Sequence, residues 1–152
     1  MMVTMTNFAG LRPHGVQPDN VRMEERERVE RIVAAAQETK AEDIVVYDVR
    51  GHSTVTDYVL ICSGRSQAHV RGVVDKVEET LKKAGIRAGA LEGYQEGSWV
   101  LMDYDVIIVH VFHPETRAFY DLDGLLEEFP QEQFVTPGGE AEGAAEQSYS
   151  LP

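Results

Sequence analysis

Hydrophobic residues between positions 23 and 130 recur at two spacings, one helical and one extended. In residues 23–39 and 67–84 they recur every three or four positions, which places them on one face of a helix. The predicted buried faces are Val29, Ile32, Val33 and Ala36 in the first segment, and Val70, Val73 or Val74, Val77 and Leu81 in the second. Gly85 follows the second segment and predicts its end.

Five short runs of apolar and β-branched residues predict strands. They cover residues 44–49, 58–62, 87–91, 99–102 and 106–112. The first two runs contain almost no polar residues, which is typical of strands covered on both faces. The three-residue link 103–105 predicts an antiparallel hairpin between the last two strands. The helix after the second strand predicts a crossover connection, so we expect a mixed sheet.

The chain after the last strand predicts one more helical region, over residues 114–129, that ends at Pro130. We expect four of its side chains to pack inward: Phe119, Tyr120, Leu122 and Leu125. The element order indicates one α/β domain over residues 23–130, with a mixed five-stranded sheet flanked by helices. Residues 1–22 show no periodicity, and residues 131–152 are rich in Gly, Glu and Ala. These two segments are predicted to be a disordered leader and a flexible acidic tail.

The net charge of the chain disfavours some classes of binding partner. The formal net charge is −12, because 26 acidic residues outnumber 14 basic ones. This excess disfavours a protein that binds nucleic acid by neutralising phosphates, and it disfavours docking on an anionic membrane surface. It is compatible with a basic protein partner. We therefore expect little direct contact with nucleic acid and none with a membrane.

The single cysteine and the hydropathy pattern indicate the cellular compartment of the protein. Cys62 excludes an internal disulfide framework and a multi-cysteine zinc site, and it lies in an apolar run where cysteine is usually a small buried hydrophobe. No apolar run approaches the roughly 20 residues of a membrane span. The first 20 residues lack the basic and apolar regions of a secretion signal. We expect a cytoplasmic protein.

Two aspartates provide the sharpest indication of an enzyme. Asp103 and Asp105 precede a long apolar strand, and two carboxylates at this spacing can hold Mg²⁺, as in nucleotidyltransferases. That fold normally places a Gly-Ser loop and a helix shortly before the pair. Here Gly64-Arg65-Ser66 lies far upstream and contains no lysine. We therefore favour a polar hairpin turn at the aspartates and a simple helix cap at Ser66.

The histidines and the aromatic residues allow further interpretations. His110 and His113 could ligate a metal, but their spacing matches no metal motif, which favours a structural or surface-contact role. Trp99 begins a strand beside a polar loop. It is predicted either to belong to the core or to be an exposed anchor for a protein partner, and the residues alone do not separate the two.

Several motifs taken together and in order resemble the ribosomal silencing factor (RsfS, Iojap-like) family. They are D-Y-V-L-I-C-S-G-R-S from Asp57, H-V at His69, E-G at Glu92, W-V-L-M-D from Trp99, D-V-I-I-V-H-V-F from Asp105 and E-T-R-A-F-Y-D-L from Glu115. The resemblance covers roughly residues 25–126. Each piece alone is weak, but the set with these spacings is specific.

The resemblance implies a nucleotidyltransferase-like topology without catalysis, cofactor or metal. It implies that the chain binds the large ribosomal subunit through ribosomal protein fourteen, blocks joining of the small subunit and represses translation. An assembly role on the large subunit and a metal-dependent nucleotidyltransferase using the two aspartates remain as alternatives. The resemblance also implies a homodimer. The residues that we expect to contact the ribosomal protein are Trp99, Asp103, His110, Arg117 and Tyr120.

Two positions depart from the family pattern. The family usually has glycine before the second aspartate of the hairpin, where this chain has Tyr104, so the turn is expected to differ. A tryptophan near the end of the last helix is replaced by Leu126, which removes one packing or contact anchor.

Overall fold

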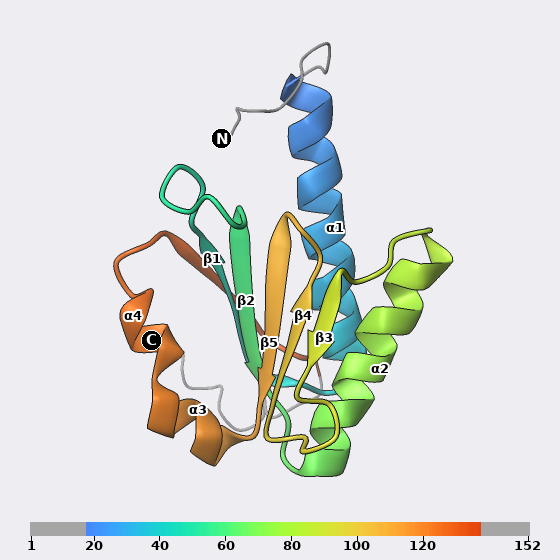
Figure 1. Ribbon diagram of the computed structural model, residues 1–152, viewed down its shortest axis with the longest axis vertical. Coiled ribbons are helices and arrows are strands. Elements are labelled where there is room, and N and C mark those ends of the chain that lie inside the picture. Colours follow the sequence, from blue (N-terminus) through green and yellow to red (C-terminus); the bar gives the residue numbers. More distant parts are fainter. Residues whose placement is uncertain (1–17, 138–152) are drawn as a thin grey trace.

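The computed structural model describes residues 18–137 (Figure 1). Four helices and six strands follow one another in this range. In chain order they are α1 (Pro18–Glu38), β1 (Glu42–Asp48), β2 (Tyr58–Ser63), α2 (Gln67–Lys83), β3 (Ala90–Glu92), β4 (Trp99–Asp103), β5 (Ile107–Phe112), α3 (Pro114–Tyr120), α4 (Leu122–Leu125) and β6 (Gln131–Phe134). The two long helices and the five strands that we predicted are present, with shifts of a few residues at their ends. The last helical region is divided into α3 and α4 and ends at Leu125 rather than at Pro130. The first helix begins at Pro18, five residues before its predicted start.

The strands form one mixed sheet in the order β3-β4-β5-β2-β1-β6. Only β2 and β5, at the centre, run parallel to each other, and all other neighbours are antiparallel. Helix α2 provides the crossover after β2, and β4 and β5 form the predicted hairpin. The mixed α/β sheet with flanking helices is therefore confirmed.

The main core lies between one face of the sheet and the helices α1 and α2, which stand together on that side in Figure 1. The predicted apolar faces of both helices are buried, as are Leu60 and Cys62 of β2. Each fully buried Val or Leu side chain stabilises the fold by about 1.5–3 kcal/mol. Helix α2 is capped as predicted by Ser66, whose Oγ accepts a hydrogen bond of 3.0 Å from the backbone N–H of His69.

The sheet has six strands rather than the five predicted. The additional strand, β6, pairs with β1 and lies in the segment that we expected to belong to the tail. Its sequence, Gln-Glu-Gln-Phe, has a single apolar residue and no alternation of apolar and polar residues. An edge strand exposed to water does not need an apolar face, so the sequence pattern does not reveal it. A buried hydrogen bond of 2.6 Å from Thr136 Oγ1 to the carbonyl of Ala41 secures the chain just after it. Residues 1–17 and 138–152, which hold most of the predicted leader and tail, lie outside the described residues.

The other face of the sheet is covered in part by α3 and α4, which lie apart from α1 and α2 in Figure 1. Tyr47, Ile61 and Phe112 form a second, smaller core with Leu122 and its neighbours. The inward packing predicted for the last helical region is wrong for three of its four side chains. Phe119, Tyr120 and Leu125 are exposed, and only Leu122 is half-buried.

A break at Asp121 explains this difference. Asp121 has a left-handed backbone with φ of 51°, which ends α3, and its side chain caps α4 through the N–H of Gly124. The two short helices therefore do not share one continuous helical periodicity. Neither helix contains a fully buried residue.

No helix in residues 18–137 combines the length and the apolar character needed to cross a membrane.

Candidate partner-binding surface

The face of the sheet opposite α1 and α2 remains partly open over β4 and β5. Along β4, Val100 and Met102 point into the main core, whereas Trp99, Leu101 and Asp103 alternate with them on the open face. All three of these side chains are half-buried. A strand whose second face is apolar but incompletely covered is typical of a contact surface for a partner.

Trp99 lies at the centre of an aromatic cluster that joins β4, β5 and α3. Its ring centroid is 4.8 Å from that of Phe112 and 4.9 Å from that of Tyr120. Its indole Nε1–H donates a hydrogen bond of 3.0 Å to Nδ1 of His110. Trp99 therefore combines the two roles that the sequence left open, a core residue and an exposed anchor. Its indole N–H is bonded inside the protein, while the side chain keeps some exposure.

The hydrogen bond from Trp99 determines the form of His110. A nitrogen that accepts a hydrogen bond carries no proton, so the neutral ring is protonated on Nε2. His110 is buried, with only 8% of its surface exposed, and burial lowers its pKa to about 4. The imidazole is therefore neutral at physiological pH, and the pair with Trp99 persists there.

A close backbone approach supports the position of Trp99. Gly93 precedes β4 with φ of +85°, and a Cβ atom added to it would overlap the carbonyl of Trp99. Only glycine meets both requirements, which accounts for the Glu-Gly motif at this point in the chain.

Asp103 lies at the far end of the same face. It is four residue steps along the strand from Trp99, or roughly 13 Å. Its Oδ1 accepts a hydrogen bond of 2.8 Å from the backbone N–H of Asp105, whose φ is 73°. The two aspartates thus form the polar hairpin turn that we favoured. Asp105 lies outside β4 and β5, and among residues 18–137 no three His, Cys, Asp or Glu side chains gather as metal ligands would.

Arg117 does not join the open face. Its guanidinium is directed inward and donates four hydrogen bonds: two to the Asp123 carboxylate at 2.8 and 3.1 Å, one to Ser63 Oγ at 2.8 Å and one to the carbonyl of Asp43 at 3.0 Å. Tyr47 donates a further hydrogen bond of 2.6 Å to Asp123. These contacts join α3, α4, β1 and β2, so the geometry indicates a clamp rather than a surface contact.

The carboxylate in this clamp is held in its charged form. Burial alone would raise the pKa of Asp123, but the hydrogen bonds from Arg117 and Tyr47 lower it below its usual value. Burial and the hydrogen bond to Asp123 together raise the pKa of the Tyr47 hydroxyl, which therefore stays protonated and able to donate.

Of the five residues predicted to contact a partner, the structure brings together Trp99, His110 and Tyr120. Asp103 shares their face at a distance, and Arg117 is enclosed. Sequence reasoning missed Leu101, which lies on the open face between Trp99 and Asp103. The period of two along β4 is the signal that could have identified it.

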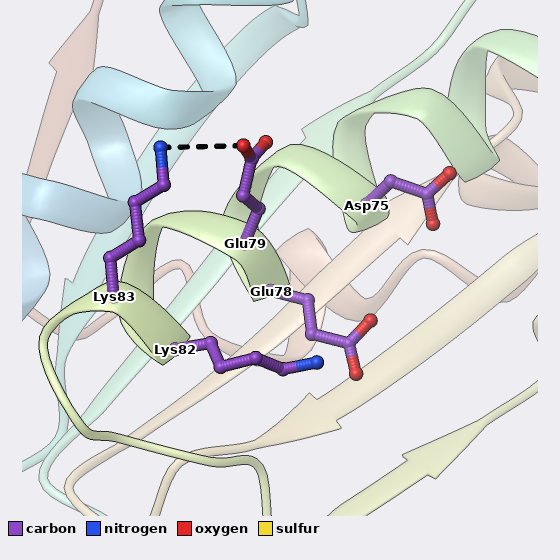
Figure 2. A pocket seen from close by; sticks show the side chains of 5 residues that line it. All are labelled: Asp75, Glu78, Glu79, Lys82 and Lys83. Atoms are coloured by element: carbon purple, nitrogen blue, oxygen red, sulfur yellow. Dashed lines mark ion pairs between the residues drawn. The ribbon is translucent and has the colours of Figure 1, made fainter.

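Other candidate groups have structural roles. Cys62 is fully buried, and burial raises the pKa of its thiol to about 12, which leaves it protonated. His113 caps α3. A hollow on the outer side of α2 is lined by charged side chains, among which Lys83 pairs with Glu79 at 3.4 Å (Figure 2). Its walls are ends of solvated side chains, which is typical of an ordinary wet helix face.

A family model and curated relatives with the same name match this chain. A family described as "Ribosomal silencing factor during starvation" matches residues 22–150. The ribosomal silencing factor RsfS of Halalkalibacterium halodurans is 35% identical over 108 residues, which cover 71% of this chain and 92% of that protein. RsfS of Bacillus subtilis is 38% identical over 97 residues, covering 64% and 82%.

A more distant relative and a solved structure are also similar to this chain. The mouse protein named "Mitochondrial assembly of ribosomal large subunit protein 1" is 29% identical over 100 residues, which cover 64% of this chain and 44% of that protein. A crystal structure of a Bacillus halodurans protein superposes with a TM-score of 0.64 at 34% identity, covering 72% of this chain and 99% of the other.

Proposed function

The chain belongs to the ribosomal silencing factor family, and from this premise we propose that it binds the large ribosomal subunit through ribosomal protein fourteen. Bound there, it blocks joining of the small subunit and so represses translation. The proposal includes a cytoplasmic location and a homodimer in solution.

The observation that carries this proposal is the aromatic cluster on the open face of β4 and β5. Tryptophan and tyrosine are enriched among the residues that dominate binding energy, and Trp99 needs no polar group from a partner because its indole N–H is already paired. Its ring can therefore meet an apolar surface without leaving a buried donor unsatisfied. Leu101 extends the same apolar face, and Asp103 ends it with a negative charge.

Charge supports a protein partner on the ribosome. A net charge of −12 repels exposed rRNA phosphates and attracts the basic proteins that lie among them. Such complementarity mainly increases the rate of encounter and selects the partner.

A second function is favoured by one comparison. The name of the mouse relative refers to assembly of the large ribosomal subunit, so the same face could bind immature subunits rather than mature ones. The two functions differ in the particle that is bound, and gradients of cell extract would separate precursor particles from mature subunits.

Sedimentation with purified subunits tests the proposal directly. The protein should migrate with large subunits in a sucrose gradient, and it should reduce the joined peak when small subunits are added at joining concentrations of Mg²⁺. Leu101→Ser should weaken the complex at least tenfold, because it places a hydroxyl at the centre of the contact. Val55→Ser is the control, since Val55 is an exposed apolar residue in a separate loop. Free protein at the top of the gradient, with normal joining, would refute the proposal.

A further inference from the structure

Strand β4 begins at Trp99, and this end of the strand is paired on one side only. The outer neighbour of β4 is β3, which has three residues and pairs with Leu101, Met102 and Asp103. Within residues 18–137, Trp99 therefore has a strand partner only in β5. Strand ends with few contacts open more readily than the centre of a sheet. The position of Trp99 thus depends on the loop that leads into it, residues 93–98.

Two side chains of α2 attach this loop to the helix layer behind the sheet. The hydroxyl of Tyr94 donates a hydrogen bond of 2.8 Å to Oδ1 of Asp75, and Tyr94 also packs against the main core. The guanidinium of Arg71 donates a hydrogen bond of 3.1 Å from Nη1 to the carbonyl of Gln95. Because Arg71 and Asp75 are four positions apart, they lie on the same side of α2. One side of this helix therefore holds two successive residues of the loop.

The second half of the loop is closed and joined to α3. Gly97 is buried with φ of +71°, and a Cβ atom added to it would lie 2.6 Å from Nη1 of Arg71. Its N–H donates a hydrogen bond of 3.1 Å to the carbonyl of Gly93, which closes a turn. The carbonyl of Ser98 accepts a hydrogen bond of 2.9 Å from the N–H of His113, the cap of α3. The loop is therefore fixed on both sides of the sheet.

The other end of β4 is held from the same helix layer. Arg28 of α1 donates a hydrogen bond of 3.2 Å from Nη1 to the carbonyl of Tyr104, the first residue after the strand. The side chain of Tyr104 is buried in the main core. Both ends of β4 are thus fixed by helices that cover the opposite face of the sheet.

We propose that Arg71 and Asp75 of α2 are positioning residues, which hold the loop so that Trp99 has its binding geometry before the partner arrives. This inference rests on the proposed function, and it adds residues that lie behind the sheet, away from the open face. A contact surface that is already ordered loses less conformational entropy on binding. Without the attachment only a fraction of the molecules would hold Trp99 correctly, and the apparent Kd would rise in inverse proportion to that fraction.

Removal of the bond between Tyr94 and Asp75 tests the proposal. Tyr94→Phe and Asp75→Ala should each bind purified large subunits about three- to tenfold more weakly in a sedimentation titration. The double variant should bind no more weakly than the weaker single variant, because both substitutions remove the same bond. Asp75→Asn keeps an acceptor oxygen at this position and should bind as tightly as the unmodified chain.

Glu79→Ala is the matched control for the lost charge. Glu79 lies one turn further along α2, and Figure 2 shows both carboxylates on this helix. Its ion pairs with Lys76 and Lys83, at 3.8 and 3.4 Å, stay within α2. The substitution therefore removes the same charge without releasing the loop, and the variant should keep full affinity.

The single tryptophan reports the position of the loop without a partner. In Tyr94→Phe and Arg71→Met, acrylamide should quench the emission of Trp99 more strongly than in the unmodified chain. Backbone amides of residues 99–103 should exchange faster with deuterium, while those of the central strand β2 keep their protection. A general loss of stability would instead raise exchange in both strands.

The outcomes separate this inference from the proposed function. Full affinity of Tyr94→Phe and Asp75→Ala would overturn the inference while the proposed function stands. Weaker binding with unchanged quenching and exchange would also overturn it, because the α2 side chains would then contact the partner themselves. Absence of binding by the unmodified chain would overturn the proposed function, and unchanged quenching in the variants would overturn the positioning of Trp99 even then.

Discussion

Replacement of Arg117 by methionine should destabilise the fold strongly, because the guanidinium bonds to three separate segments. Methionine replaces the aliphatic stem of arginine but donates no hydrogen bond, so Asp123 would keep only the hydroxyl of Tyr47 as a side-chain donor, and Ser63 Oγ would lose its donor. Removing one partner of a buried ion pair costs about 3–5 kcal/mol. The side chains of Arg117 and Asp123 are 13% and 29% exposed, so water recovers part of this, and we expect a loss of about 2–3 kcal/mol.

Thermal unfolding followed by circular dichroism measures this loss. For a domain of this size 1 kcal/mol corresponds to about 3–5 °C, so the Tm should fall by about 6–15 °C. Arg31→Met is the matched control. Its ion pair with Glu27 has a similar length of 2.7 Å, but the two side chains are 47% and 60% exposed, and such pairs contribute at most about 1 kcal/mol.

Fluorescence provides a second and more local measurement. The chain has a single tryptophan, Trp99, whose ring contacts that of Tyr120 of α3 in a tilted arrangement. If Arg117 positions α3, its loss should change the emission of Trp99 at temperatures where the sheet is still folded. The reasoning is refuted if Arg117→Met keeps its Tm and its emission spectrum but no longer binds large subunits, because the guanidinium would then be a contact and not a clamp.

Two further predictions concern buried polar groups. Since the pKa of His110 is about 4 in the folded state and near 6.5 when unfolded, only the unfolded chain gains this proton as pH falls between these values. The free energy of unfolding should therefore decrease by about 2 kcal/mol from pH 7 to pH 5 in urea titrations, and a His110→Gln variant with an equal decrease would contradict this. Tyr104→Phe should be neutral or stabilise the fold by up to about 1 kcal/mol, because the buried hydroxyl has no hydrogen-bond partner within residues 18–137. The control Tyr47→Phe loses its bond to Asp123 and should be destabilising, whereas a loss of stability in Tyr104→Phe similar to that of the control would contradict the prediction.

The two long helices and the central strands could be predicted, because each has a pattern that one physical requirement produces. Helix α2 combines an apolar stripe, a serine cap and a glycine stop, and all three signals agree. The continuous apolar run of β2 reflects a strand covered on both faces. Strand β6 lacks any such signal, because it adds to an edge through backbone hydrogen bonds that its side chains do not reveal.

The side-chain directions in the last helical region could not be predicted, because one backbone angle determines them. An unbroken helix would have kept a single periodicity through Phe119 and Leu125, whereas the left-handed conformation of Asp121 resets it. The residues that the break turns outward are Phe119, Tyr120 and Leu125. The same break brings Asp123 within reach of Arg117, a pairing that joins residues six positions apart and has no helical spacing.

The place of Trp99 depended on the register of the hairpin, which the sequence pattern does not specify. A link of only residues 103–105 would pair Met102 with residue 106 and Trp99 with Val109, which belongs to the main core. In the structure Met102 pairs with Val109 and Trp99 with Phe112, and the link is closed by a hydrogen bond of 3.0 Å from the Tyr104 N–H to the Ile107 carbonyl. A shift of three positions is odd, so it exchanges the two faces of one strand relative to the other. The burial of Tyr104 in the main core accompanies this register. Trp99 can thus lie beside His110 on the open face because Met102, and not Trp99, fills the core opposite Val109.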